Sequence, residues 1–163
     1  LSNNNLTAAR NGGVGIVRAA AGKSSGKWYW EVKLDTAADQ FVGVANSTAS
    51  LTSVLGSNRN GWSMVMDDGV KFNRGNQGYY GTKGSNGDVI GIALDMDSKK
   101  ISFYKKKSGS TACTNIGTAF TNLSGTLYPA WGSQFQAAQG TVNFGATPFA
   151  CPVPSGFTAG VTQ

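Results

Sequence analysis

Residues 24–35 read SSGKWYWEVKLD and carry the clearest strand pattern in the chain. Successive side chains of a β-strand point to opposite faces, so this stretch separates into two sets. The sets are Trp28, Trp30, Val32 and Leu34 on one face, and Tyr29, Glu31, Lys33 and Asp35 on the other. A face of tryptophans and aliphatic residues is typical of a protein core. The stretch therefore favours a buried sheet over the other interpretation, a sugar-binding aromatic platform with Glu31 as a catalytic acid.

The rest of the chain repeats the strand pattern and shows no helical one. No stretch of a dozen residues keeps helical spacing free of glycine or proline, whereas short alternating runs recur between turn signals. Tight antiparallel hairpins are predicted at the Asp68-Gly69 pair and at DMDSKK, residues 95–100. The expected strands are residues 14–20, 27–35, 41–46, 61–66, 69–73, 88–95, 100–105, 117–123, 127–132 and 141–145. So many short strands predict an all-β fold of two packed antiparallel sheets, with the doubly apolar strand 88–95 at its centre.

The composition fits one turn-rich domain. The 163 residues include 23 glycines and only 13% charged residues, with a formal net charge of +6. A chain of this length can fold as a single domain, residues 1–163, without a disulfide or a metal. No apolar run is long enough for membrane insertion, and a start at Leu1 suggests a domain excised from a larger protein. The main basic cluster is expected to be solvated around one turn rather than to bind nucleic acid, and it comprises Lys99, Lys100, Lys105, Lys106 and Lys107.

Patterns for catalysis and metal binding are weak. The sequence has no histidine, which removes the commonest general base and the usual zinc ligands. Glu31 is the only glutamate, and no second carboxylate stands beside it as glycoside hydrolysis requires. Asp95 and Asp97 fit a turn better than a calcium loop, because lysines follow them. We therefore expect no enzyme activity, no catalytic residue, no cofactor and no metal. Cys113 and Cys151 could form one disulfide, which their spacing does not decide.

Several stretches, taken in order, resemble the SPRY domain, a β-sandwich family of jelly-roll, concanavalin A-like architecture that serves mostly in protein recognition. SSGKWYWEV resembles the first signature strand of the family, with Trp30, Glu31 and Val32 in the matching places. Five later stretches resemble successive parts of the family pattern: FVGVAN, LGSNRNGWSMVMDDGVKFN, GDVIGIALDMDSKKISFYKK, AFTNLSGTLYPAW and VNFGATPF. The short polar N-terminus and the richness in Asn, Thr and Gly resemble the SPRY domains of bacteria and phages. That likeness implies a module of a phage virion, for example a phage tail used in host recognition, or of a bacterial surface protein.

The resemblance implies a module that binds a protein or peptide through loops at one end of the sandwich. The matching loops are residues 46–50, 72–80 and 131–139. The candidate ligand-binding residues in them are Asn46, Phe72, Arg74, Asn76, Tyr79, Tyr80, Trp131, Gln134 and Phe135. Flat apolar rings with hydrogen-bonding ends suit a binding face. A lectin-like module for surface glycans and a purely structural domain are the alternatives, since the same side chains suit sugars.

Some of these aromatic residues also suit an ordinary core. Trp62 is expected in the core, whereas Trp131 and Phe72 fit the core and a ligand contact equally well. Tyr79 and Tyr80 are neighbours on the chain, so one ring should pack inward and the other should face solvent. The sequence leaves the oligomeric state open. The implied location is a virion or a cell surface, or the cytoplasm if the domain belongs to a eukaryotic adaptor.

Overall fold

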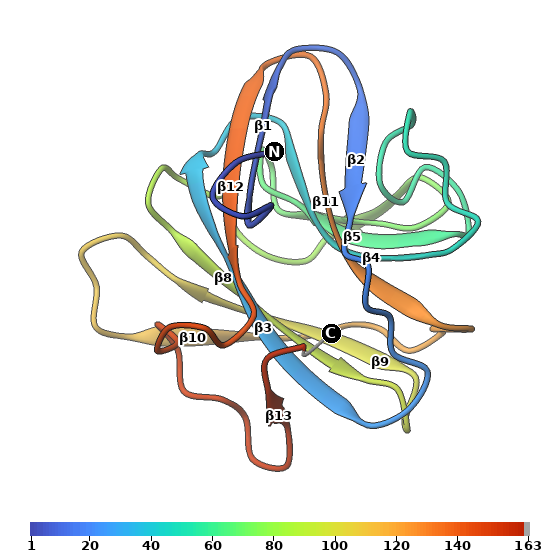
Figure 1. The fold of residues 1–163 in the computed structure, drawn as a ribbon, viewed down its shortest axis with the longest axis vertical. Coiled ribbons are helices and arrows are strands. Elements are labelled where there is room, and N and C mark those ends of the chain that lie inside the picture. The colour runs from blue at the N-terminus through green and yellow to red at the C-terminus, as the bar shows by residue number, and fades with distance from the viewer. Residues whose placement is uncertain (162–163) are drawn as a thin grey trace.

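The structure is a computed structural model that describes residues 1–161, and it consists of two packed β-sheets (Figure 1). No residue in this range is helical. The strands are β1 Thr7–Asn11, β2 Gly15–Arg18, β3 Lys27–Thr36, β4 Gln40–Asn46, β5 Gly61–Val65, β6 Val70–Phe72, β7 Asn76–Tyr79, β8 Val89–Asp95, β9 Lys100–Lys106, β10 Cys113–Phe120, β11 Leu127–Ser133, β12 Ala137–Asn143 and β13 Thr158–Ala159. The predicted all-β sandwich is confirmed.

The two sheets have seven and six strands. The seven-stranded sheet runs β1-β12-β3-β8-β9-β10 with β13 beside β3, and the six-stranded sheet runs β2-β11-β4-β5-β6-β7. Neighbouring strands pair antiparallel, except that β13 pairs with β3 in parallel. Both predicted hairpins are confirmed, because β5 pairs with β6 and β8 pairs with β9. Gly69 in the first turn has a φ of +78°, a conformation that glycine adopts at little steric cost.

The main hydrophobic core lies between the sheets. From β3 it receives the predicted face, Trp30, Val32 and Leu34, with Trp28 packed at the margin. The neighbouring strand β8 adds Ile90, Ile92 and Leu94, and the facing sheet adds Val42, Val44, Trp62, Met64 and Trp131. Full burial of a large apolar side chain stabilises a fold by about 1.5 to 3 kcal/mol. The alternation in residues 27–35 therefore identified the core face of β3 correctly.

The other face of β3 is also covered, by the segment that follows β12. The Tyr29 ring is fully buried there and meets Phe149 edge-on, with ring centroids 5.2 Å apart. At Gly91 on the neighbouring strand β8, a Cβ atom would lie only 2.2 Å from the Tyr29 hydroxyl. Glycine at this position therefore makes room for the tyrosine. β3 and β8 are both central strands with two buried faces, as the sequence predicted for residues 88–95.

Glu31 and a disulfide fasten this C-terminal segment. The Glu31 carboxylate accepts hydrogen bonds from the backbone N–H groups of Ala150 (2.8 Å) and Cys151 (2.7 Å). The Tyr29 hydroxyl donates a further hydrogen bond to Glu31, at 3.1 Å. Cys151 forms a disulfide with Cys113 on the edge strand β10, with Cα atoms 5.6 Å apart. The pairing that the sequence left open is therefore formed in the structure.

Three of the observed strands lie outside the predicted set. β7 is exposed along its length, β13 has two residues, and β1 buries only its first two residues, so none shows a clear alternation. β10 begins at Cys113 rather than at residue 117, because shifts in its register between residues 115 and 117 and between residues 118 and 120 break the pattern. β12 covers Ala137–Asn143 rather than residues 141–145.

The prediction that the lysine cluster is solvated around one turn is wrong. Lys99 and Lys100 lie at the turn between β8 and β9, whereas Lys105 lies near the far end of β9. The Lys105 side chain is buried and forms an ion pair with Asp88 at 3.2 Å. Alternation along β9 turns Lys105 to the same side as the buried ring of Phe103. The basic surface is therefore smaller than the sequence implies.

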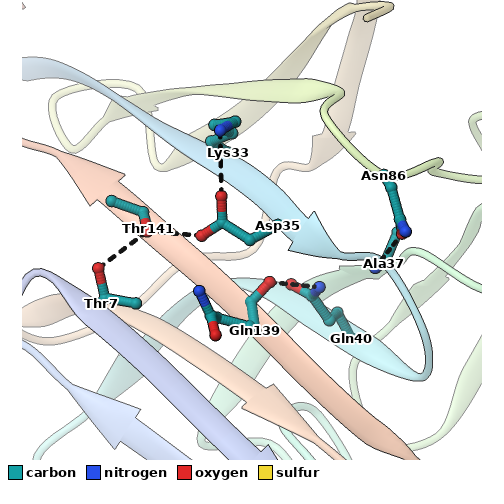
Figure 2. A network of polar contacts seen from close by, with 8 residues as sticks. All are labelled: Thr7, Lys33, Asp35, Ala37, Gln40, Asn86, Gln139 and Thr141. Carbon is teal, nitrogen blue, oxygen red and sulfur yellow. Dashed lines mark hydrogen bonds and ion pairs between the residues drawn. The ribbon is translucent and has the colours of Figure 1, made fainter. Parts of the chain in front are cut away.

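A polar network joins three neighbouring strands where β3 leads into β4 (Figure 2). The Asp35 carboxylate of β3 forms an ion pair with Lys33 (3.2 Å) and accepts a hydrogen bond from the Thr141 hydroxyl of β12 (2.6 Å). The Thr141 oxygen lies 2.9 Å from the Thr7 hydroxyl of β1. These contacts run across the sheet and link β3, β12 and β1.

Candidate functional site

The two ends of the six-stranded sheet present different loops. In the pairing of β4 with β11, Gln40 lies opposite Ser133 and Asn46 lies opposite Leu127. Residues 134–136 therefore leave the sheet at the same end as residues 37–39 and 66–69, which we call the Phe135 end. Residues 47–60, 73–75 and 121–126 leave at the opposite end, which we call the Arg74 end. Strand β4, about 20 Å long, separates the two ends, so the expectation that all three recognition loops share one end is wrong.

The candidate residues differ widely in exposure. The exposed candidates are Arg74, Asn76, Tyr79 and Phe135. The half-buried candidates are Asn46, Phe72, Tyr80 and Gln134, and the one buried candidate is Trp131. The Trp131 side chain belongs to the main core, as does Trp62. Phe72 packs against Phe41 on the outer face of the six-stranded sheet, with ring centroids 5.8 Å apart. The sequence allowed either a core role or a ligand contact for Trp131 and Phe72. In the structure both side chains pack against other apolar residues.

Tyr79 and Tyr80 face opposite ways, as predicted. The Tyr79 side chain is 86% exposed and lies on the edge strand β7. The Tyr80 ring packs against Phe103, and its hydroxyl donates a hydrogen bond to the Gly117 carbonyl. Burial raises the pKa of Tyr80 to about 12. Of the two rings, only that of Tyr79 is exposed to solvent.

Phe135 projects from the loop between β11 and β12. Its side chain is 73% exposed, and its φ of +63° lies in the left-handed region. The Gln134 N–H donates to the Asp39 carbonyl of the adjacent loop (3.2 Å), and the Gln136 N–H donates to the Gln134 carbonyl (2.8 Å). A left-handed residue other than glycine costs free energy and persists only where its surroundings fix it. These hydrogen bonds therefore fix the backbone of the loop, from which the Phe135 side chain extends into solvent.

Gln40 and Ala37 fix the base of this loop pair (Figure 2). Gln40 is fully buried at the start of β4, and its Nε2 donates to the Gln139 carbonyl in the facing sheet (3.0 Å). Its Oε1 accepts a hydrogen bond from the Trp131 indole N–H (2.6 Å). The Ala37 N–H donates to the Asn86 side-chain oxygen (2.8 Å). Because the buried amide of Gln40 is hydrogen-bonded on both sides, it links the two sheets beneath the Phe135 end.

Three aspartates lie at the same end. Asp39 belongs to residues 37–39, and Asp67 and Asp68 lie in the turn between β5 and β6. Burial raises the pKa of Asp39, the negative charge of Asp67 raises it further, and hydrogen bonds from Gln136 partly oppose both effects. Lys83 lies 3.7 Å from Asp67, and both side chains are exposed. The Phe135 end therefore carries three aspartates, one of them paired with Lys83, together with Arg10, which lies opposite Ala138 just after the Phe135 loop.

The Arg74 end contains a polar pocket of about 460 Å³. Asn46 and Arg74 both line it, so the structure brings these two predicted residues together. The remaining lining residues are Thr48, Arg59, Asn60, Trp62, Asn73, Asn122 and Ser124. The lining residues come from four separate segments. Most are of types common in turns, and no pattern in the sequence indicates that they lie together. The arginines and asparagines make this pocket a candidate site for a polar ligand.

Glu31 is not placed as a catalytic acid. Both of its oxygens accept hydrogen bonds beneath the C-terminal segment, and its side chain is buried. Within residues 1–161, no three His, Cys, Asp or Glu side chains gather where they could hold a metal ion. The same part of the chain has no helix with the length and apolarity needed to cross a membrane.

Comparisons with known proteins agree with this architecture. The SPRY domain family model matches residues 27–147. Ran-binding protein 9 of Xenopus tropicalis is 33% identical over 128 residues, which are 76% of this chain and 22% of that protein. E3 ubiquitin-protein ligase RKP of Arabidopsis thaliana is 33% identical over 143 residues, which are 83% of this chain and 10% of that protein. The chain thus spans a small part of the length of these relatives.

A solved structure shows the same fold. The crystal structure of the SPRY domain of human HERC1 superposes with a TM-score of 0.74 at 22% sequence identity, covering 87% of this chain and 90% of that one. The family match runs from the start of β3 past the end of β12 and so includes the strands that build the core. Sequence, fold and comparisons lead to the same conclusion: the chain belongs to the SPRY domain family.

Proposed function

We propose that this domain is a non-catalytic recognition module that binds a peptide segment of a protein partner across the Phe135 end. The observation that carries the proposal is the Phe135 ring, which is 73% exposed on a loop fixed by backbone hydrogen bonds. A large exposed ring on a fixed backbone offers apolar contact area, and only the rotation of its side chain must be ordered on binding. Membership in the SPRY family supports a protein-interaction module, and one relative is named for binding Ran.

The surface around Phe135 favours a partner of a particular chemistry. The strand order β11-β4-β5-β6-β7 places Phe135 and the exposed Tyr79 about 20 Å apart, which about six extended residues span. Asp39, Asp67 and Asp68 lie on the loops between them. Because complementary charge selects partners, the bound segment carries Lys or Arg side chains between apolar ones.

Selection from a displayed peptide library on the immobilised chain tests this proposal. We expect basic, apolar-flanked peptides whose affinity, measured by calorimetry, falls about tenfold or more in Phe135→Ala. Leu1→Ala is the matched control, because Leu1 is also an exposed apolar residue, at 71%, but precedes β1, and it is the other end of β1, at Asn11, that lies beside the Phe135 loop. Equal binding by Phe135→Ala and the unchanged chain would contradict the proposal.

A glycan array run with the same variants separates the lectin-like alternative. Glycan binding that Phe135→Ala abolishes, with no peptide selected, would replace the protein partner by a carbohydrate. If neither class binds, the purely structural role becomes the better explanation. Nucleic acid is not among the proposed partners. Lys105 is buried and paired with Asp88, so it adds no positive charge to the basic surface.

We also propose that the domain works in an oxidising place, such as a cell surface or a virion, as one module of a longer protein. The Cys113–Cys151 disulfide supports the first part, since disulfides persist mainly outside reducing compartments. The greater length of the relatives supports the second. The relatives named above come from an animal and a plant, so they lend no support to a bacterial or phage source. Alkylation and mass spectrometry of the protein from its natural source should find both cysteines paired; two free thiols would favour the cytoplasm.

A further inference from the structure

The polar pocket at the Arg74 end lies apart from the surface proposed for peptide binding. It is lined by segments 46–48, 59–62, 73–74 and 122–124. None of its lining residues is an aspartate or a glutamate, whereas two of them, Arg59 and Arg74, are arginines. The charged groups of the lining are therefore all positive.

The orientation of the Asn122 amide follows from its neighbour. The Trp62 indole N–H lies 3.1 Å from Asn122 Oδ1, and an indole nitrogen can only donate. The oxygen of the amide is therefore the atom that meets Trp62. Its NH₂ group takes part in no hydrogen bond with the described residues and remains a free donor at the pocket wall.

A second amide is fixed in the same way. Asn46 Oδ1 accepts hydrogen bonds from the backbone N–H (3.1 Å) and the hydroxyl (2.9 Å) of Thr48, so the Asn46 NH₂ points the other way. That NH₂ donates to Asn60 Oδ1 at 3.2 Å. In this chain of contacts the oxygens of both amides accept, and the NH₂ of Asn60 donates to no described residue. The Asn73 NH₂ donates to the Gly61 carbonyl (2.7 Å), so this third amide presents its oxygen, and the pocket offers two free NH₂ groups beside one free amide oxygen.

The two arginines add charged donors. Both side chains are exposed, and neither guanidinium has an ion pair or a hydrogen bond within residues 1–161. Arg74 is held at a φ of +58°, and its N–H donates to the Asn58 carbonyl (3.2 Å). The Gly75 N–H donates to the Gly56 carbonyl (3.1 Å), which joins the loops that carry Arg59 and Arg74. These backbone hydrogen bonds fix the Arg74 loop against the loop that carries Arg59, so both guanidinium groups extend from anchored segments.

We propose that this pocket binds a phosphoryl group. The fork of one guanidinium suffices for the two oxygens of a carboxylate, whereas two guanidinium groups and two amide NH₂ groups match the three terminal oxygens and the double charge of a phosphomonoester. The group can belong to a free phosphate compound or to a phosphorylated side chain of a protein, and the pocket recognises the chemistry that both share. This inference goes beyond the proposed function and does not depend on it.

Titration of the ¹⁵N-labelled 163-residue chain with inorganic phosphate, at constant ionic strength, tests the proposal. We expect saturable shifts of the side-chain NH₂ resonances of Asn60 and Asn122, and no comparable effect of acetate. Arg59→Gln and Arg74→Gln should each weaken phosphate binding about tenfold. Arg10→Gln is the matched control, because it removes one exposed positive charge from β1 outside the pocket and should leave binding unchanged.

Three outcomes would overturn the proposal: no shift of the two amides, equal binding of acetate, or equal loss in Arg10→Gln, which would indicate general charge attraction. A parallel titration with a Gly-Ser peptide that carries one phosphoserine identifies the source. Tighter binding of this peptide than of inorganic phosphate supports a phosphorylated protein ligand, and weaker binding supports a free phosphate compound. Phosphate binding should persist in Phe135→Ala, which keeps this test separate from that of the peptide surface.

Discussion

The Glu31 carboxylate holds the C-terminal segment against β3 by accepting three hydrogen bonds. An amide in its place has only one oxygen and could not accept all three in the same way. Its Oε2 accepts from the Ala150 N–H, and its Oε1 accepts from the Cys151 N–H and the Tyr29 hydroxyl. Glu31→Gln places an NH₂ group opposite at least one of these donors. We expect the free energy of unfolding, measured with urea, to fall by about 2 to 3 kcal/mol, because a buried donor loses its acceptor.

Asp67→Asn serves as the comparison for Glu31→Gln, since it also converts a carboxylate into an amide. Asp67 is exposed, and its ion pair with Lys83 is 3.7 Å long, so we expect a change below about 0.5 kcal/mol. A similar small change for Glu31→Gln would show that the segment does not depend on the buried carboxylate.

Asp88 gives the fold a defined acid sensitivity. Burial alone would raise the pKa of Asp88, but hydrogen bonds from the Ser108 N–H, the Lys105 ammonium and the Ser85 N–H outweigh it and lower the pKa. The folded chain thus favours the carboxylate, whose contribution to stability is complete above the ordinary pKa of about 4 and is lost as pH falls through the lower folded pKa. Asp88→Asn should therefore flatten the pH dependence of unfolding below about pH 4.

At neutral pH the same substitution leaves Lys105 buried without its ion-pair partner. We expect a loss of about 3 to 5 kcal/mol in urea unfolding. Replacing both residues, as in Asp88→Asn with Lys105→Met, should recover a large part of this loss, because no buried charge is then left unpaired. An acid slope equal to that of the unchanged chain would contradict the role of Asp88.

At the level of elements, the disulfide and the C-terminal segment act together. Cys113 lies on the edge strand β10, and Cys151 lies in the segment over β3, 38 positions along the chain. Closing a loop of this length restricts the unfolded chain, which stabilises the fold by about 2 to 4 kcal/mol. Cys113→Ser and Cys151→Ser should each lower the free energy of unfolding by that amount. The double variant should lower it by no more than either single variant, because each substitution removes the same disulfide. Clearly unequal single effects would show that the cysteines act separately.

The strands differ in how well the sequence predicts them, for physical reasons. β3 was predictable because one of its faces meets the main core, so Trp30, Val32 and Leu34 repeat at every second position. The burial of its other face was not predictable, since Tyr29 and Glu31 are covered by a distant segment that has no regular pattern. β7 escaped prediction because an exposed edge strand has no face to keep apolar.

For the whole molecule, the sequence identified candidate residues but not their grouping. Exposure of Phe135 and Arg74 was consistent with their positions in polar, glycine-rich loops. Their separation depends on the direction of each strand and on the pairing of β4 with β11, which no local pattern contains. The pocket at the Arg74 end was unpredictable for the same reason, because four segments far apart in the sequence build it.

The two ends should bind their ligands independently. About 20 Å of β4, whose strand is buried from Gln40 to Ala45, separates the Phe135 loop from the pocket, and the two sites share no residue. Coupling requires that one ligand favour a conformation that changes the other site, and β4 is hydrogen-bonded along both edges, to β11 and β5, which opposes such a change. We therefore expect saturating inorganic phosphate to change the peptide Kd, measured by calorimetry, by less than about twofold. A change of fivefold or more, which corresponds to a coupling free energy of about 1 kcal/mol, would mean that the sandwich transmits binding from one end to the other.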